Sequence, residues 1–272
     1  MPNAEQLPHL LKLVDDPSHW IREVVGKELA SYGPRLDYEL NRLSPEPSED
    51  QRRHVRDVIE QYHRSWLALH WSGWKNEPDE FQQLEAAHDL IARFQYGNAF
   101  PIRLPTLLDQ LAAEYREACG ETSATQLAHY LFRGLPIRGD RQTYYDPRNS
   151  NLAACILERK GIPISLCCIY MLVGRRLGLE IAGLPLPGHF LARVTHAGQV
   201  YAVDCFDGGR FLSRHDLAAL HRPVADSIRR LIERPATTAS IMERVLHNLH
   251  RAYLRENREA DAMLMIELLS DP

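Results

Sequence analysis

Residues 144–194, YYDPRNSNLAACILERKGIPISLCCIYMLVGRRLGLEIAGLPLPGHFLARV, carry the strongest local signals in the chain. Two helices are predicted in the middle of this stretch. Ser150 is expected to cap the first, NLAACILERK, which Gly161 ends, and Ser165 is expected to cap the second, LCCIYMLVGRRL, which Gly178 ends. The second helix is apolar over most of its circumference, a pattern typical of a helix at the centre of a hydrophobic core.

Strand character follows the second helix. Residues 189–204, HFLARVTHAGQVYAVD, contain two β-rich runs around an Ala-Gly pair, which predicts a hairpin. With a loop of two or four residues, Leu191 lies opposite Asp204, and the alternation of side chains places His189 on the same face. A three-residue loop would shift the register and separate His189 from Asp204. The spacing therefore predicts a contact between these two side chains, either direct or through one water molecule.

Three polar side chains are predicted to converge beside this hairpin. Ser165 lies at a helix N-terminus, where unpaired amides and the positive end of the helix dipole favour an anion. His189 can take a proton from such a nucleophile, and Asp204 can fix the histidine tautomer and stabilise the imidazolium. Structural roles also fit: Ser165 can be a simple helix cap, and Asp204 can accept hydrogen bonds near the Gly208-Gly209 turn.

The motifs in residues 144–209 resemble those of the SirB-type branch of the transglutaminase-like superfamily. The elements that carry the resemblance are Asn149-Ser150, GIPISL at 161–166, RLG at 176–178, PGHF at 187–190, and Asp204 followed by Gly208-Gly209. The resemblance implies an α+β fold with a papain-like core, in which a central helix packs on an antiparallel sheet, flanked by helical N- and C-terminal regions. Active members of the superfamily carry a Cys-His-Asp site.

The resemblance assigns roles by position. His189 matches the catalytic histidine and Asp204 the aspartate, while Ser165 stands where active members have a cysteine. Cys168 is the alternative nucleophile, because it lies one helical turn beyond Ser165 on a similar face, whereas Cys167 is turned away by about 200°. Inside an apolar helix, both thiols are also expected to behave as inert core residues.

Two functions follow from the resemblance. One is a transglutaminase-like protein that is non-catalytic or catalytically altered and has a regulatory or protein-interaction role, because a serine hydroxyl is much less acidic than a thiol and needs a well-aligned base and an oxyanion hole. The alternative is a hydrolase or acyltransferase that acts on amide or peptide bonds through Ser165 or Cys168, His189 and Asp204. Neither function implies a metal or an organic cofactor.

The rest of the chain is predicted to be helical. Residues 1–43 include a stretch that resembles one HEAT-type repeat, and the polar residues 44–48 are a candidate linker. Residues 50–135 are expected to form helices that lead into the core at residues 136–215. Residues 216–272 are expected to form C-terminal helices, whose ending ERVLHNLHRAYLRENREADAMLMIELL resembles tetratricopeptide-like helices.

Composition and charge exclude several classes of function. The chain has 272 residues, 44% of them hydrophobic, and a net charge of −4 in which basic residues alternate with acidic ones, so nucleic acid is an unfavoured partner. No apolar run approaches the roughly 18 residues that cross a bilayer, and the polar N-terminus does not resemble a signal peptide. We therefore expect a cytoplasmic, bacterial-type protein that binds protein or peptide partners through its helical regions and has no membrane contact.

Other candidate sites give weaker signals. The cysteines form neither a disulfide framework nor a CxxC zinc motif; they are Cys119, Cys155, Cys167, Cys168 and Cys205. Two histidine pairs lack an acidic third ligand at metal spacing; they are His247 with His250 and His215 with His221. Two arginine clusters are expected to be ordinary helix surface; they are Arg52, Arg53 and Arg56, and Arg229, Arg230 and Arg234.

Overall fold

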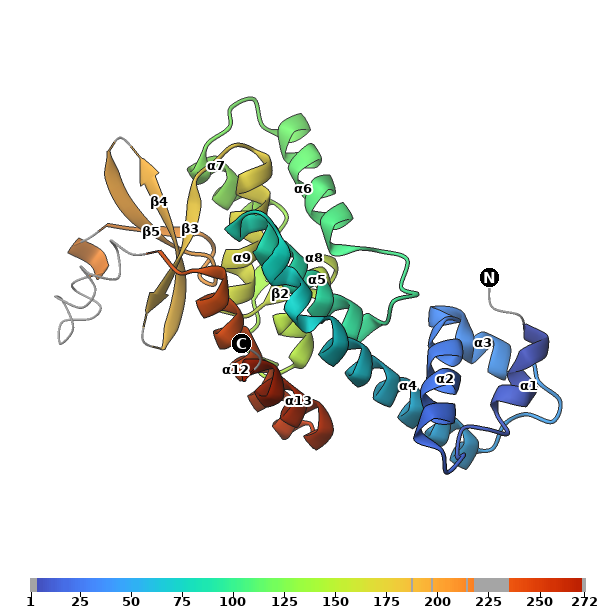
Figure 1. Ribbon diagram of the computed structural model, residues 1–272. Coiled ribbons are helices and arrows are strands. Elements are labelled where there is room, and N and C mark those ends of the chain that lie inside the picture. The colour runs from blue at the N-terminus through green and yellow to red at the C-terminus, as the bar shows by residue number, and fades with distance from the viewer. Residues whose placement is uncertain (1–3, 187, 197, 214, 218–234, 271–272) are drawn as a thin grey trace. The chain divides into compact units, whose positions relative to one another are not determined.

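The structure of the chain is a computed structural model that describes residues 4–186, 188–196, 198–213, 215–217 and 235–270 (Figure 1). The chain forms two compact units. The first comprises the residues up to Trp71 together with Leu90–Ile102, and the second comprises Ser72–Asp89 and the residues from Arg103 onward.

The first unit is helical. Its elements are η1 (Ala4–Gln6), α1 (Leu7–Leu10), α2 (His19–Ala30), η2 (Gly33–Arg35), α3 (Leu36–Leu40) and α4 (Glu49–His70). Helices α2 and α4 pack together, and Gly26 of α2 is required there because a Cβ would collide with the Val58 carbonyl oxygen. Ser48 caps α4 with a reciprocal bond pair to Gln51, so residues 44–48 join α3 to α4 inside this unit.

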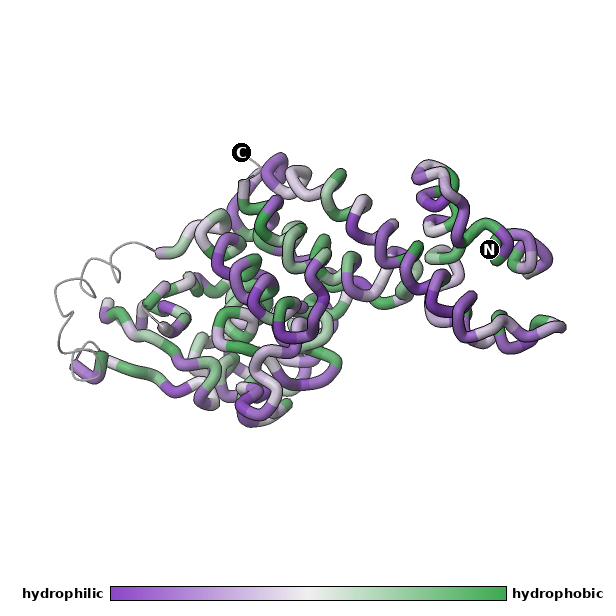
Figure 2. Tube along the Cα trace, turned by 90° about the horizontal axis from the view of Figure 1, so that it is seen from below, coloured by the Kyte–Doolittle hydropathy of each residue, from purple (hydrophilic) through white to green (hydrophobic). Residues whose placement is uncertain are grey.

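The second unit contains most of the predicted core. Its helical elements are η3 (Trp71–Asn76), the first part of α5 (Glu80–Tyr96), α6 (Leu104–Ala118), α7 (Ala124–His129), the π-helical turn η4 (Tyr130–Gly134), η5 (Pro147–Ser150), α8 (Leu152–Glu158), α9 (Pro163–Arg176), α12 (Thr238–Arg255) and α13 (Glu259–Leu269). Hydrophobic and hydrophilic stretches alternate along many of the helices (Figure 2), as expected where each helix buries one side.

Helix α9 lies at the centre of this unit. All residues from Ile164 to Gly174 are buried. The helix packs on strands β3 and β4 and on helices α6, α7 and α8 (Figure 1). Gly174 lets the helix approach the sheet closely, since a Cβ there would come within 2.5 Å of Ile181 Cδ1. The predicted central, fully buried helix is confirmed.

An antiparallel sheet covers α9. Its strands run in the order β3 (Ile181–Leu186), β4 (His189–His196), β5 (Gln199–Asp204) and β6 (Arg210–Leu212), and a short parallel pair is formed by β1 (Arg138–Gly139) and β2 (Lys160–Gly161). His196 pairs with Gln199 and Ala192 with Val203, the register predicted for a two-residue loop. The α+β class and the hairpin register are both confirmed.

Two predicted helix caps are wrong. Helix α9 begins at Pro163, with Ile162 as its N-cap, so Ser165 is the third residue of the helix and makes no cap bond. Proline favours the first helical position because its fixed φ suits the helix and its missing N–H costs nothing there. Similarly, Ser150 ends the preceding 3₁₀ turn, and the side chain of Asn151 caps α8 by accepting from the Ala154 amide.

The C-terminal helices α12 and α13 pack against each other. They confirm the helices predicted within residues 241–269, with a break at Asn257, which has a left-handed φ of 58°. Part of the region predicted to form C-terminal helices, residues 218–234, lies outside the described residues, and with it His221, Arg229, Arg230 and Arg234. Among the described helices, none is both long enough and apolar enough to cross a membrane.

Candidate functional site

The structure brings His189 and Asp204 into direct contact. His189 Nε2 lies 3.1 Å from Asp204 Oδ2, as the hairpin register predicts. The His189 side chain is 29% exposed and the Asp204 side chain 11%, so the imidazole can be reached from solvent while the carboxylate is mostly enclosed. With Nε2 donating to the carboxylate, Nδ1 is the ring nitrogen left to exchange a proton.

A tight turn fixes Asp204. Its Oδ1 accepts a hydrogen bond from the Asp207 amide at 3.0 Å, and its carbonyl oxygen accepts one from the Gly209 amide at 2.9 Å. Gly209 has a φ of 69° and lies against Ala128 and Phe132, so a side chain at this position would be strained and crowded. Burial opposes ionisation of Asp204, but the contact with His189 and the Asp207 amide outweigh it and lower the pKa of the carboxyl.

Ser165, the predicted nucleophile, is fully buried. Its Oγ has no hydrogen-bond partner of ordinary geometry among the described residues. Its polar neighbour is the Cys155 thiol; burial raises the pKa of this thiol, and the Ser165 hydroxyl opposes that rise. The hydroxyl is therefore enclosed by the core.

The thiols of α9 are also buried. Cys167 Sγ donates to the carbonyl oxygen of Phe190 at 3.5 Å, so Cys167 is the cysteine that faces strand β4. Burial raises the pKa of both Cys167 and Cys168 well above the usual range. At Cys168, the neighbouring thiols of Cys167 and Cys155 add to the effect of burial and raise the pKa further.

A cavity of about 420 Å³ opens beside the residue that precedes His189. Its lining residues are Tyr144, Tyr145, Asp146, Ser150, Ile162, Gly188, Arg244, His247, Asn248, Arg251 and Ala252. Gly188 precedes His189, and Ile162 is the N-cap of α9, so the cavity adjoins the segments that carry two of the predicted site residues. Its size is in the range of small-molecule sites.

This cavity was not predicted from the sequence. Of the histidine pair considered above as a weak metal site, His247 lines the cavity, and His250 Nδ1 bonds to the Ala262 carbonyl oxygen at 2.9 Å. The available signal was the spacing of four polar residues of α12 at i, i+3, i+4 and i+7, namely Arg244, His247, Asn248 and Arg251. No group of three His, Cys, Asp or Glu side chains in the described part of the chain could hold a metal ion.

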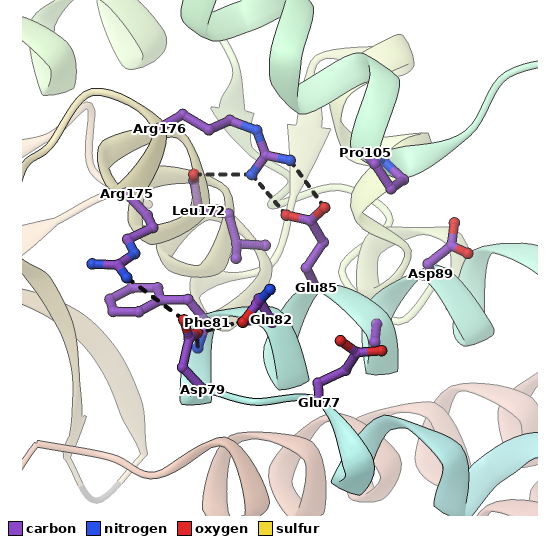
Figure 3. Close-up of a pocket in the computed structure, with 11 residues that line it drawn as sticks. Glu77, Asp79, Phe81, Gln82, Glu85, Asp89, Pro105, Leu172, Arg175 and Arg176 are labelled. Atoms are coloured by element: carbon purple, nitrogen blue, oxygen red, sulfur yellow. Dashed lines mark hydrogen bonds and ion pairs between the residues drawn. The ribbon is translucent and has the colours of Figure 1, made fainter.

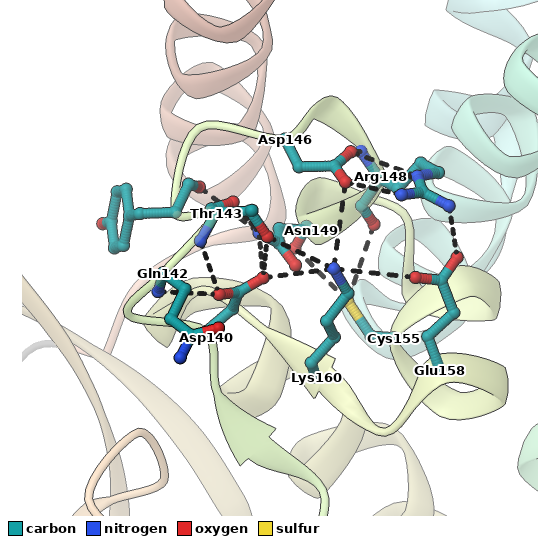
Figure 4. A network of polar contacts seen from close by, with 10 residues as sticks. Asp140, Gln142, Thr143, Asp146, Arg148, Asn149, Cys155, Glu158 and Lys160 are labelled. Atoms are coloured by element: carbon teal, nitrogen blue, oxygen red, sulfur yellow. Dashed lines mark hydrogen bonds and ion pairs between the residues drawn. The ribbon is translucent and has the colours of Figure 1, made fainter.

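A polar network holds the loop that forms one wall of the cavity (Figure 4). Asp140 accepts hydrogen bonds from the Gln142 and Thr143 amides and from Asn149 Nδ2, and it pairs with Lys160 at 3.2 Å. Burial opposes ionisation of Asp140, but these bonds outweigh it and lower the pKa of its carboxyl. The network fixes the backbone from which Tyr144 and Tyr145 project.

A second cavity, of about 470 Å³, lies elsewhere in the same unit (Figure 3). Both arginines in its lining form ion pairs. Arg176 makes a bidentate ion pair with Glu85, and Arg175 pairs with Asp79 at 3.6 Å. Arg176 Nε also donates to Asp109 at 2.6 Å. Because both of its arginines are already paired with carboxylates, this cavity offers no free guanidinium from the described residues to an anionic ligand.

Comparisons with known proteins cover the core at residues 136–215 and sequence on both sides of it. Residues 103–247 match a sequence family described as the transglutaminase-like superfamily. A UPF0162 protein of Xylella fastidiosa (strain 9a5c) is 34% identical over 199 residues, which are 69% of this chain and 71% of the relative.

Two further relatives differ in how much they share. UPF0162 protein PA3419 of Pseudomonas aeruginosa is 28% identical over 184 residues, which are 64% of this chain and 66% of that protein. F-box only protein 21 of Homo sapiens is 32% identical over 79 residues, which are 29% of this chain and 13% of that protein. No solved structure matches the chain.

Proposed function

The chain belongs to the transglutaminase-like superfamily and to the UPF0162 family, and from that premise we propose that it is a SirB-type member that binds a ligand or protein partner without turning it over. The observation that carries the proposal is the burial of Ser165, whose side chain is 0% exposed. A nucleophile must reach the substrate, and this hydroxyl lies behind the residues that pack on the first turn of α9.

The thiols support the same proposal. Cys167 and Cys168 are as buried as Ser165, and burial raises the pKa of both. Because the thiolate is the nucleophilic form of cysteine, a raised pKa removes the species that would attack an amide. The His189–Asp204 pair is thus partly exposed, while both candidate nucleophiles, Ser165 and Cys168, are enclosed.

One relative carries a similar stretch within a much longer chain. A 79-residue stretch of the chain is similar to 13% of F-box only protein 21, so this kind of sequence also occurs as a small part of a larger protein. In this proposal, the chain acts as a regulatory or protein-interaction component, and a peptide or protein is the partner.

One observation favours the alternative function. The 3.1 Å contact of His189 Nε2 with Asp204 is the arrangement that a histidine general base requires. A hydrolase or acyltransferase using this pair would need a local movement of the first turn of α9 that exposes Ser165. The alternative function therefore has a definite requirement: activity must disappear when His189 is replaced, and also when the nucleophile, Ser165 or Cys168, is removed.

The proposal is tested by assaying the purified protein for release of p-nitrophenol from p-nitrophenyl acetate, for hydrolysis of peptide amides and for incorporation of an amine into a glutamine-containing peptide. We expect rates equal to those of Ser165→Ala and His189→Ala, and close to buffer alone. Circular dichroism spectra and melting curves establish that the three proteins are folded. Enzyme-like turnover by the wild type that Ser165→Ala abolishes would show that the protein is an enzyme.

Ser165→Cys sharpens this test, because it introduces the nucleophile that active members of the superfamily use. If burial is what prevents catalysis, this variant also stays inactive and its new thiol reacts slowly with iodoacetamide. If the variant becomes active in a manner that requires His189, the residue type rather than burial prevents catalysis in the wild type, and the physical basis given above is wrong.

A further inference from the structure

The helix face that lines the cavity beside Gly188 is polar along two turns. Arg244, His247, Asn248 and Arg251 recur at the spacing that places side chains on one side of a helix. On an amphipathic helix, the polar side ordinarily faces solvent and the apolar side packs on the core. Here it forms part of the lining of a cavity that Tyr144, Tyr145 and Gly188, the residue before His189, also line.

The two guanidinium groups in this cavity have no carboxylate of their own. Within the described residues, neither Arg244 nor Arg251 makes an ion pair, and Arg244 Nη1 donates only to the carbonyl oxygen of Leu186, at 3.2 Å. Asp146 is the acidic side chain in the lining, and it is already engaged by Arg148 at 2.8 Å and by Lys160 at 3.8 Å. The cavity therefore carries uncompensated positive charge.

Arg244 also ties the cavity to the His189–Asp204 pair. It bonds to Leu186 at the end of β3, and its guanidinium lies 5.6 Å from the centre of the Phe190 ring in β4. These contacts lie on either side of His189 in the sequence. Burial lowers the pKa of Arg244 against the opposing effect of Tyr144, so an anion beside it would relieve an unfavourable environment.

We propose that this cavity binds the anionic oxyacid group of a ligand, a carboxylate or a phosphate, between Arg244 and Arg251. Arginine presents a planar fork of donors that matches both groups, and a charge-assisted pair is stronger than a neutral hydrogen bond. His247 and Asn248 supply further donors on the same wall, and the tyrosine rings offer flat surfaces to the rest of the ligand. The inference deepens the proposed function by naming the class of ligand.

The test is isothermal titration calorimetry with three probes: inorganic phosphate, the peptide acetyl-Gly-Glu-Gly-amide and its neutral match acetyl-Gly-Gln-Gly-amide. We expect at least one anionic probe to bind at least about tenfold more tightly than the neutral peptide. Preference for phosphate would identify a phosphorylated ligand, and preference for the glutamyl peptide would identify an acidic peptide.

Variants locate the binding. Arg251→Gln removes an exposed guanidinium that makes no bond to the described protein, and we expect it to weaken the preferred anion by about tenfold. Arg244→Lys keeps the positive charge but loses the planar array of guanidinium donors, and it should also weaken binding of the preferred anion. Arg175→Gln is the matched control, because it removes the same charge from the other cavity of the same unit and should leave the affinity unchanged.

Two results would overturn the inference: no preference of the wild type for either anion over the neutral peptide, or equal losses in Arg251→Gln and Arg175→Gln. The second would indicate that net charge, and not the cavity, attracts the anion. Both results would leave the amidase assays untouched, while turnover in those assays would overturn the proposed function and leave the anion site standing. The two claims can thus fail separately.

Discussion

The hydroxyl of Ser165 is enclosed in the first turn of α9, and within the described chain no polar group of suitable geometry takes up its hydrogen bond. The sequence predicted its location well, at the beginning of a central helix. The prediction that Ser165 caps the helix was wrong because the helix begins two residues earlier, at Pro163. The burial of Ser165 could not be predicted from the local sequence pattern. Burial depends on which elements pack over the helix end.

His189 and Asp204 were predictable because strand geometry is regular. Once the two-residue loop is assumed, the alternation of side chains determines which residues share a face, and the structure has them 3.1 Å apart. The cavity beside them was not predictable in the same way. Arg244 and Arg251 lie more than 50 residues after Gly188 in the sequence. Whether they line the same cavity as Gly188 depends on how α12 packs on the core.

A prediction at the scale of residues concerns the cysteines. Cys119 is partly exposed, whereas Cys155, Cys167, Cys168 and Cys205 are buried. Burial raises the pKa of the thiols at 155, 167 and 168, which lowers both their access to reagent and their thiolate fraction. We expect iodoacetamide to label one thiol rapidly in the native protein, and mass spectrometry to place the label on Cys119.

The control is Cys119→Ser, which should lose the fast label, while denaturation should make every remaining thiol reactive. Fast native labelling of Cys168 that His189→Ala suppresses would reveal a thiolate activated by the histidine. That result would favour the enzyme over the non-catalytic protein.

At the scale of elements, the start of a helix depends on a competition among neighbouring residues. Ser150, Asn151 and Ser165 can all act as caps, yet Asn151 alone among them does so. Asp146 caps the 3₁₀ turn η5, which draws Ser150 into that turn and leaves the next residue to begin α8. Local propensity identified the helices correctly and misplaced two of their starts by one to three residues.

This competition predicts opposite results for two substitutions. Asn151→Ala removes the acceptor of the Ala154 amide and should lower the free energy of unfolding by about 0.5–2 kcal/mol. Ser165→Ala removes a buried hydroxyl that makes no hydrogen bond of ordinary geometry and has the weakly polar Cys155 thiol as its neighbour, so it should leave stability unchanged or raise it slightly. Urea denaturation followed by circular dichroism measures both; a loss in Ser165→Ala as large as that in Asn151→Ala would show that the hydroxyl makes a bond.

At the scale of the whole molecule, the helices and strands of the core were predictable from the sequence, whereas local patterns do not signal where the compact units begin and end. The candidate linker at residues 44–48 lies within one compact unit, whereas α5 belongs to the second unit up to Asp89 and to the first from Leu90. A continuous helix gives no local signal of such a division. Contacts between segments far apart in the sequence decide which residues of α5 pack into which core. The hydrophobic periodicity of a single helix does not predict such contacts.

The buried histidine His88 makes the stability of the folded chain depend on pH. His88 in α5 is fully buried, and neither ring nitrogen has a hydrogen-bond partner within the described residues. Burial lowers the pKa of His88 to about 3. An unfolded histidine titrates near its ordinary value of about 6.5, so below that pH the unfolded chain binds a proton that the folded chain excludes.

The free energy of unfolding should therefore fall as the pH drops below 6.5, by about 2 kcal/mol between pH 8 and pH 5 from this group alone. Asp140 and Asp204, whose pKa values are lowered, contribute stability that is present above their ordinary pKa and is lost at more acidic pH. Urea unfolding at pH 8 and pH 5 should show a smaller pH dependence in His88→Leu than in the wild type, whatever the variant's stability at pH 8. The control is His129→Leu, which alters an exposed histidine and should keep the pH dependence of unfolding seen in the wild type. If the wild type and His88→Leu show identical pH dependence, His88 is protonated in the folded protein as readily as in the unfolded chain.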